Sequence, residues 1–241
     1  MMEESFLTIQ KDSDETAWKF YAKFYDEQLN NRHFKIKGKD YNVSGDVCFN
    51  IKVKKNNRFT LLSSIIKDDL DSDKMKELND LLTIFLHSPM NISLLPVTGG
   101  LNNIKGQFAS DRFDSFLWLL DAYYKGLSAP ILNRGTKNSY IGNQKILGNI
   151  LNEIGSVKNF CSIFYGIDDD GYLDHLINNG KKAIVEPSDY YAYLLEAVRF
   201  WTIRLDLLVK KDIFMKNGAV MNDYCLHLQE LKDLIINLEN F

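Results

Sequence analysis

Apolar and polar residues alternate along the stretch Asp46-Val47-Cys48-Phe49-Asn50-Ile51-Lys52-Val53. Successive side chains of a β-strand point to opposite faces, so this pattern predicts a strand with one buried and one wet face. A second apolar run follows from Phe59 to Ile66, and the polar residues 54–57 between the two runs fit a turn. The region between His33 and Ile66 therefore predicts a β-hairpin or a small antiparallel sheet.

Helical periodicity precedes this region and dominates the chain after about residue 70. The first helix is predicted from near Asp14 to Leu29, with Asp12 or Ser13 as its N-cap. Two further helices are predicted to begin after Ser72 and Ser110, which act as their caps. Others are predicted at about 140–154, 156–165 and 169–179, from Pro187 onward, and over 224–238. The short apolar run Ile92–Leu95 suits one more strand. We therefore predict an α+β fold, a mostly α-helical domain with a small N-terminal antiparallel β-sheet or hairpin.

No internal repeat, low-complexity tract or Pro/Gly/Ser linker divides the chain. A single domain over residues 1–241 is therefore predicted, with an N-terminal helix and hairpin at about 14–66 packed on a helical body at about 70–241. In the last helix the apolar residues alternate steps of four and three, which is coiled-coil spacing. That helix either docks on its own core or forms a homodimer or protein contact through the stripe Tyr224, Leu228, Leu231, Ile235 and Leu238.

The composition places the chain among ordinary globular proteins. Of its 241 residues, 45% are apolar and 25% are charged, which excludes a disordered protein, and the net charge of −3 favours neither nucleic acid nor an anionic membrane. Three dispersed cysteines argue against a disulfide framework, and no apolar run is long enough to span a membrane. The acidic first five residues carry no signal-peptide pattern, so a cytoplasmic protein is expected. Abundant Lys, Asn and Ile indicate an AT-rich coding genome, which is often that of a bacterium or a phage.

The most unusual stretch is the glycine- and asparagine-rich segment from Pro96 to Gly106. Glycines let backbone N–H groups turn toward a ligand, and a lysine neutralises an anion, so a nucleotide or phosphate site is one hypothesis. A purely structural loop is the alternative, because the spacing does not match a P-loop. The candidate ligand-binding residues in this segment are Gly99, Gly100, Asn102, Asn103 and Lys105.

Asp111-Arg112-Phe113-Asp114 follows at the head of the next predicted helix. The two carboxylates suit a helix N-terminus, and a local ion pair with Arg112 explains the motif without any ligand. Alternatively, the Arg112 guanidinium holds a carboxylate or phosphate in two parallel hydrogen bonds. Asp111 and Arg112 are therefore added to the candidate ligand site.

From the glycine-rich segment through Asp111–Asp114 to Tyr124, the chain resembles an uncharacterised bacterial family, a domain of unknown function. That family carries a Gly/Asn-rich loop followed by an Asp-Arg-Phe-Asp helix that ends in tyrosine. The chain departs from the family pattern at Gln107, Phe108 and Ala109, where basic residues are common. The resemblance implies a bacterial or phage origin and an α-rich fold, and it implies no reaction.

Residues 31–60 hold eight lysines and arginines against two aspartates. Such a basic hairpin with aromatic neighbours suits a phosphate backbone, with Lys52, Lys54, Lys55 and Arg58 as candidate nucleic-acid-binding residues. Lysines also simply solvate a hairpin and protect a sheet edge from pairing, which is the structural alternative.

Other sequence signals point away from catalysis by a recognisable motif. Asp168-Asp169-Asp170-Gly171 lacks both end ligands of a calcium loop, and the four histidines show no metal-binding spacing. Neither a metal nor a cofactor is therefore expected. The leading hypothesis is a non-enzymatic binding or interaction protein, with bacterium–phage conflict as its setting. The alternatives are an enzyme or sensor for a phosphorylated small molecule, built on the Gly99–Gly106 loop and Arg112, and a nucleic-acid-binding protein.

Overall fold

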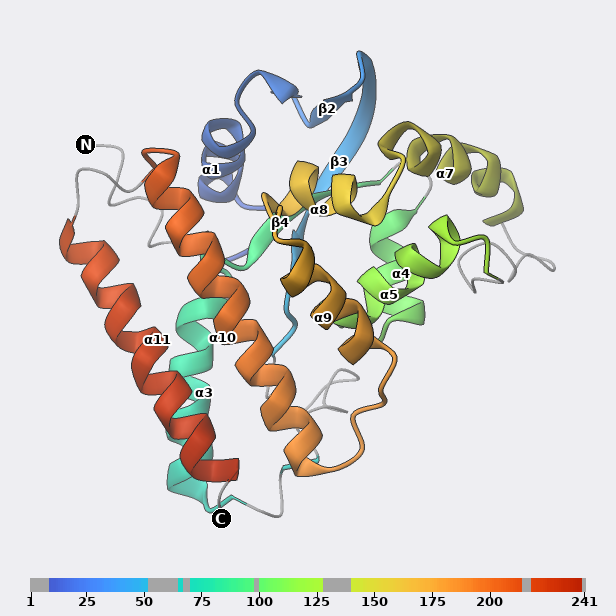
Figure 1. The fold of residues 1–241 in the computed structure, drawn as a ribbon. Helices are drawn as coiled ribbons and strands as arrows, with labels where there is room; N and C mark the ends of the chain where they lie inside the picture. The colour runs from blue at the N-terminus through green and yellow to red at the C-terminus, as the bar shows by residue number, and fades with distance from the viewer. Residues whose placement is uncertain are drawn as a thin grey trace. The chain divides into compact units, whose positions relative to one another are not determined.

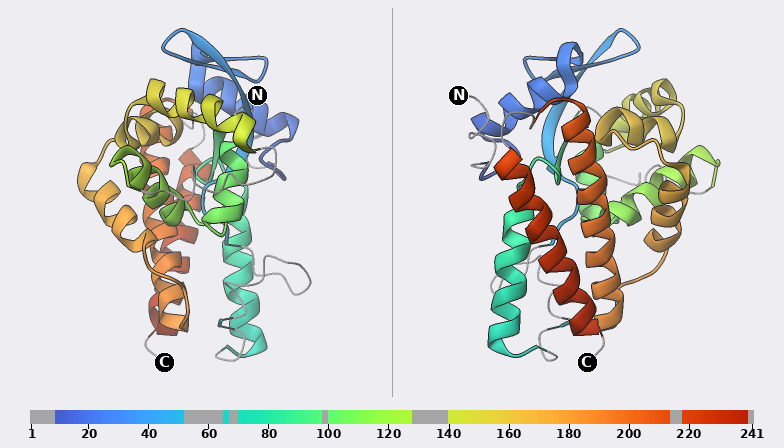
Figure 2. Two further views of the ribbon diagram at one scale, coloured as in Figure 1. Left: turned by 90° about the vertical axis from the view of Figure 1, so that its right-hand side faces the viewer. Right: turned by 60° about the vertical axis from the view of Figure 1, so that its left-hand side comes forward.

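The computed structural model describes residues 9–51, 65–66, 70–97, 100–127, 140–213 and 218–239. Figures 1 and 2 trace a small antiparallel sheet formed mainly by the N-terminal part of the chain, and a larger set of helices. The predicted α+β class, mostly helical with a small antiparallel sheet, is confirmed. None of the described helices is both long and apolar enough to cross a membrane.

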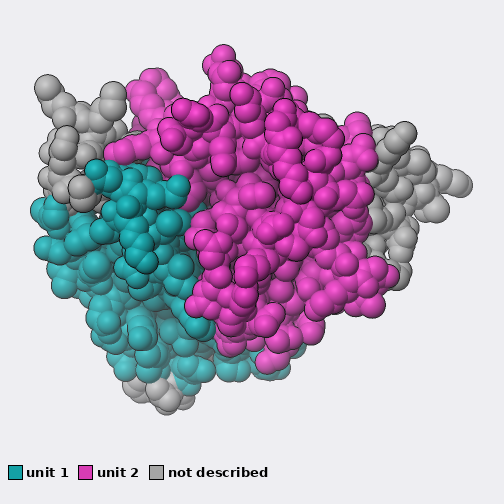
Figure 3. Space-filling model, turned by 45° about the horizontal axis from the view of Figure 1, so that its top comes forward, with its two compact units in different colours: residues 1–10, 49–91, 183–241 teal, residues 11–48, 92–182 magenta. Residues whose placement is uncertain are grey.

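The chain divides into two compact units, which Figure 3 distinguishes by colour. Unit 1 comprises residues 1–10, 49–91 and 183–241, and unit 2 comprises residues 11–48 and 92–182. Each unit is built from segments that are far apart in the sequence. The prediction of a single domain over residues 1–241 stays a prediction.

Unit 2 contains the sheet, in which each strand pairs antiparallel with the next along the chain. Its strands are β1 (Leu29–Asn30), β2 (His33–Ile36), β3 (Lys39–Val47) and β4 (Ile92–Pro96). Two-residue turns at Asn31–Arg32 and Lys37–Gly38 have positive φ at both positions, the turn geometry that matches the twist of a hairpin. The strand expected at Ile92–Leu95 is confirmed, and all five residues of β4 are buried.

The strand predicted over residues 46–53 is shifted toward the N-terminus. β3 ends at Val47, so the prediction of a strand through Cys48–Ile51 is wrong. Cys48, Phe49 and Ile51 are all buried, so their apolar character reflects burial and not strand pairing. The turn predicted at 54–57 and the run from Phe59 to residue 64 lie outside the described residues.

Helix α1 (Glu15–Tyr25) packs close to the sheet of unit 2. The Asp14 side chain caps it by accepting from the N–H of Ala17, so the predicted caps Asp12 and Ser13 are wrong by one or two residues. The backbone before the cap crosses β3 at Gly45, where a Cβ would lie 1.8 Å from the carbonyl oxygen of Asp12. Only glycine permits this approach.

The other described helices of unit 2 follow the predicted order, except that α4 was not predicted. They are α4 (Leu101–Phe108), α5 (Phe113–Tyr124), α7 (Tyr140–Ile154), α8 (Val157–Tyr165) and α9 (Asp170–Gly180), and the short 3₁₀ helix η2 (Asp26–Gln28) follows α1. α4 and α8 both contact β4. The Tyr25 hydroxyl joins α1 to these elements: it shares a hydrogen bond of 3.1 Å with Ser93 Oγ and donates to the Phe164 carbonyl at 2.5 Å.

The described part of unit 1 contains three helices, α3 (Ser72–Leu86), α10 (Pro187–Lys210) and α11 (Gly218–Glu239). α11 contacts both α3 and α10, as the right-hand view of Figure 2 shows. Phe85 stacks on Trp201 with ring centroids 4.9 Å apart. The C-terminal stripe is buried on this inner face, so its five residues dock on the protein's own core: Tyr224, Leu228, Leu231, Ile235 and Leu238.

Candidate functional site

The predicted glycine-rich loop is largely a helix, because residues 101–108 form α4. Gly100 takes the left-handed conformation with φ 76° at the helix start, and Leu101 and Ile104 are buried. Asn102 Nδ2 donates to Ser44 Oγ at 3.4 Å, and Asn103 N–H donates to Asn102 Oδ1. The loop prediction is therefore wrong over Leu101–Gly106, and Gly99 lies outside the described residues.

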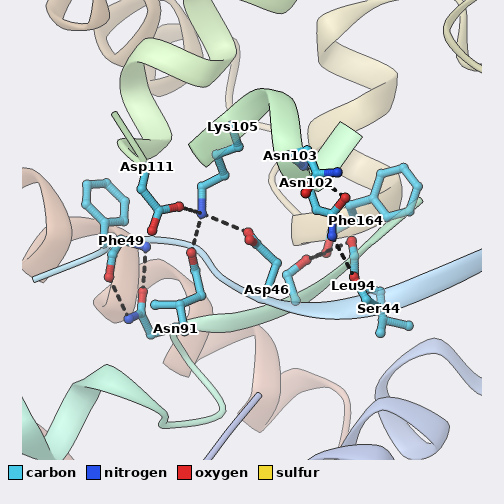
Figure 4. A network of polar contacts seen from close by, with 12 residues as sticks. Ser44, Asp46, Phe49, Asn91, Leu94, Asn102, Asn103, Lys105, Asp111 and Phe164 are labelled. Carbon is cyan, nitrogen blue, oxygen red and sulfur yellow. Dashed lines mark hydrogen bonds and ion pairs between the residues drawn. The ribbon is translucent and has the colours of Figure 1, made fainter. Parts of the chain in front are cut away.

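Lys105 is fully buried and lies between two carboxylates (Figure 4). Its Nζ is 2.8 Å from Asp46 Oδ2 and 3.6 Å from Asp111 Oδ1, and it also donates to the Val47 carbonyl. Asp46 belongs to β3, so one lysine joins the sheet to α4 and to the turn after it. The structure thus brings together Lys105 and Asp111, two of the predicted ligand-binding residues.

The charges of this trio do not cancel, since one ammonium faces two carboxylates. Burial raises the pKa of Asp46 to about 6; Lys105 opposes that shift and the charge of Asp111 adds to it. Burial alone lowers the pKa of Lys105, but the two carboxylates outweigh this effect and raise it. Lys105 is therefore charged at neutral pH, and the nearby protein atoms already satisfy that charge.

Arg112 is paired in the same way inside unit 2. Its Nε and one terminal nitrogen donate to the two oxygens of Asp114 at 3.0 and 2.6 Å, and the other donates to the Lys182 carbonyl at 2.7 Å. The carboxylate is thus bound in two parallel hydrogen bonds, the geometry predicted for a ligand. The prediction that Ser110 caps the helix is wrong, because α5 begins at Phe113 with Arg112 in the cap position.

The four candidate nucleic-acid-binding residues Lys52, Lys54, Lys55 and Arg58 lie outside the described residues. Of the basic residues on the described hairpin, Lys39 forms an ion pair with Glu153. Among the residues that the structure describes, no group of three His, Cys, Asp or Glu side chains is placed to hold a metal ion.

A surface cleft of about 440 Å³ in unit 2 was not predicted from the sequence. It is lined by Ser13, Glu15, Trp18, Ala22, Leu29, Asn31 and Arg32. The Arg32 guanidinium lies 4.9 Å from the centre of the Trp18 ring, a cation–π contact. In the sequence, Trp18 is one residue of the first predicted helix and Arg32 is one of the eight basic residues of 31–60, so neither stands out. The polar turn Asn31–Arg32 between two short strands is the one signal that places Arg32 beside α1.

Comparison with known protein families, curated proteins and solved structures finds no match. The resemblance to a domain of unknown function therefore stays a prediction.

Proposed function

We propose that the protein is a non-enzymatic binding module and that it binds a partner protein at the Trp18–Arg32 cleft. The observation that carries the proposal is the exposed guanidinium held over an indole ring in an open cleft. Tryptophan and arginine are the residues most often found to dominate protein–protein binding energies, because they combine large contact area with directed hydrogen bonds. A role in bacterium–phage conflict stays a prediction from composition and resemblance.

The pairing of Lys105 and Arg112 favours this function over a site for a phosphorylated small molecule. A phosphate at either residue has to displace a carboxylate of the protein that is already bound at 2.6–2.8 Å. Displacing it leaves that carboxylate buried without its partner, which costs several kcal/mol. These two cations therefore support the fold.

Nucleic-acid binding through the basic hairpin is the other alternative, and it makes a separate prediction. Binding to a phosphate backbone weakens steeply as salt rises, because condensed counterions are released. A gel-shift assay at low and moderate salt tests this alternative. A shift at low salt that disappears at moderate salt supports nucleic-acid binding and contradicts the proposed function.

Site-specific photo-crosslinking tests the proposal directly. A benzoylphenylalanine in place of Ala22, which lines the cleft, is expected to yield one major adduct in a lysate of the source cells. The same replacement at exposed Asn222 on α11 is the matched control. The adduct is identified by mass spectrometry, and the purified partner is then tested for direct binding. The proposal is wrong if position 22 gives no adduct, or if Arg32→Gln leaves the adduct unchanged.

A further inference from the structure

We infer that the Trp18–Arg32 cleft receives an acidic segment of the partner protein, with a carboxylate beside an apolar side chain. This inference rests on the proposed function and names the chemistry of the partner. It is carried by the Arg32 guanidinium, by a buried hydrogen-bond donor and by the apolar side chains of the lining.

Within the described part of the chain, the guanidinium of Arg32 is available to an acceptor. No carboxylate of the described residues forms an ion pair with this guanidinium, which lies over the face of Trp18. Glu15 also lines the cleft, but its carboxylate pairs with Lys19 at 2.8 Å. Arg32 therefore presents a planar fork of N–H donors to the cleft, which matches the two oxygens of a carboxylate.

The indole of Trp18 adds a second donor. Its Nε1 is buried and has no hydrogen-bond partner in the described part of the chain. A buried donor without an acceptor is uncommon in folded proteins and calls for a physical explanation. An acceptor group of the partner that reaches this nitrogen supplies one.

The other residues that line the cleft favour a particular kind of side chain next to the partner's carboxylate. Ala22, Leu29 and the indole face offer apolar surface, which favours an apolar or aromatic side chain next to the acid. A single guanidinium with Glu15 nearby suits a singly charged carboxylate better than a doubly charged phosphate, because the glutamate repels the second charge.

The backbone from which the Arg32 side chain projects is held in a defined turn. Asn31 and Arg32 have φ of 46° and 64°, and the Arg32 carbonyl accepts from the N–H of Val43 at 2.9 Å. The side chain therefore projects from a short, hydrogen-bonded turn between two strands. Such a position reduces the entropy lost when a ligand binds.

The test uses two small probes that differ only in charge, N-acetylphenylalanine and its amide. The three tryptophans give three indole signals in a ¹⁵N-labelled protein, and Trp18→Phe assigns the one from Trp18. The acid is expected to shift the Trp18 signal saturably at millimolar concentration, and the amide to bind at least about tenfold more weakly. Arg32→Gln is expected to weaken the binding of the acid by a similar factor, and Arg32→Lys is expected to weaken it less.

Lys35→Gln is the control, because it removes one positive charge from an exposed position of β2 outside the cleft. Unchanged Trp118 and Trp201 signals show that each variant is folded. Equal binding of acid and amide, no saturable shift, or equally strong competition by inorganic phosphate each overturns the inference. A crosslinked partner without a probe shift rejects only this chemistry, whereas a probe shift without a crosslinked partner rejects only the proposed function.

Discussion

Lys105 shows at the scale of one residue how this protein uses a buried charge. Its side chain is wholly buried, yet its ammonium contacts Asp46, Asp111 and a backbone carbonyl. A buried lysine is tolerated only when such partners replace the water that it loses. The same lysine therefore cannot be removed without leaving two carboxylates close together.

Lys105→Met is expected to destabilise the protein by about 3–5 kcal/mol at pH 7, because the substitution leaves the largely buried carboxylate of Asp46 and the half-buried one of Asp111 without a counter-charge. Urea unfolding followed by circular dichroism measures the change. Lys125→Met is the matched control, because Lys125 is exposed and pairs with Asp121 at the C-terminal end of α5. This substitution is expected to leave the urea midpoint unchanged. Similar effects of the two substitutions contradict the structural role of Lys105.

Asp46 makes the stability of the protein depend on pH. Its pKa in the folded protein is about 6, above the ordinary 3.8, because of burial and the neighbouring Asp111. A raised pKa means that the folded state binds the proton more tightly than the unfolded state does. The contribution of protonated Asp46 to the stability of the folded state is therefore complete below about pH 4, and it is lost as the pH rises through 6.

The free energy of unfolding is accordingly expected to fall by about 1–3 kcal/mol between pH 4 and pH 6.5, relative to Asp46→Asn. The asparagine keeps the size of the side chain but cannot titrate, so it isolates this group from the other carboxylates. Urea titrations of both proteins across the window measure the difference. A wild-type stability that rises relative to the variant across this window is the opposite result, and it shows that the Lys105 pairing outweighs burial.

The sequence indicates the kinds of residue involved in these contacts but not their partners. Lys105 stood out within a glycine-rich segment, yet its closest carboxylate, Asp46, belongs to a strand far away in the chain. Arg112 was predicted to hold an anion, and it does hold one, but from Asp114 of the same chain. Local patterns reveal which groups need a counter-charge, whereas only the tertiary fold decides which group supplies it.

At the scale of the element, two helical glycines make a matched pair. A Cβ at Gly180, the last residue of α9, would lie 2.1 Å from the carbonyl oxygen of Asp114 at the start of α5. A Cβ at Gly106, within α4, would meet nothing within 4 Å. The same substitution is therefore expected to have opposite effects at the two positions.

Gly180→Ala is expected to destabilise the protein by about 1–3 kcal/mol, because the added methyl group pushes α9 away from the α5 backbone. Gly106→Ala is expected to stabilise by about 0.5–1 kcal/mol, because alanine favours the helix that α4 already forms. Thermal and urea unfolding of both variants measure these changes. Destabilisation by Gly106→Ala contradicts the helix and supports the flexible loop predicted from the sequence.

Helices were predicted well and strands poorly, for a physical reason. The periodicity and caps of α7, α8 and α9 lie within each helix, and their predicted bounds differ from the observed ones by at most a residue or so. β3 is instead placed by hydrogen bonds to β2 through a tight turn and to the distant β4. α4 was missed because its glycine and asparagines suggested a loop, while burial of Leu101 and Ile104 stabilises the helix.

At the scale of the whole molecule, the chain path interleaves the two units. Unit 2 is interrupted by residues 49–91, which belong to unit 1 and lie between β3 and β4 in the sequence. Yet β3 and β4 are adjacent antiparallel strands, with Val47 paired to Ile92. Residues 49–91 are therefore an insertion into what is otherwise a β-hairpin.

This topology predicts that unit 2 folds without unit 1. A chain of residues 11–48 joined to residues 92–182 through Gly-Asn-Gly closes the hairpin with a short turn, since Val47 and Ile92 are already paired. It is expected to unfold cooperatively and to keep native indole and amide signals, including that of Trp18. Residues 92–182 alone are the control, because they lack every strand that pairs with β4, and they are expected to stay unfolded. If the joined chain also fails to fold, then the two units form one cooperative domain, as the sequence alone predicts.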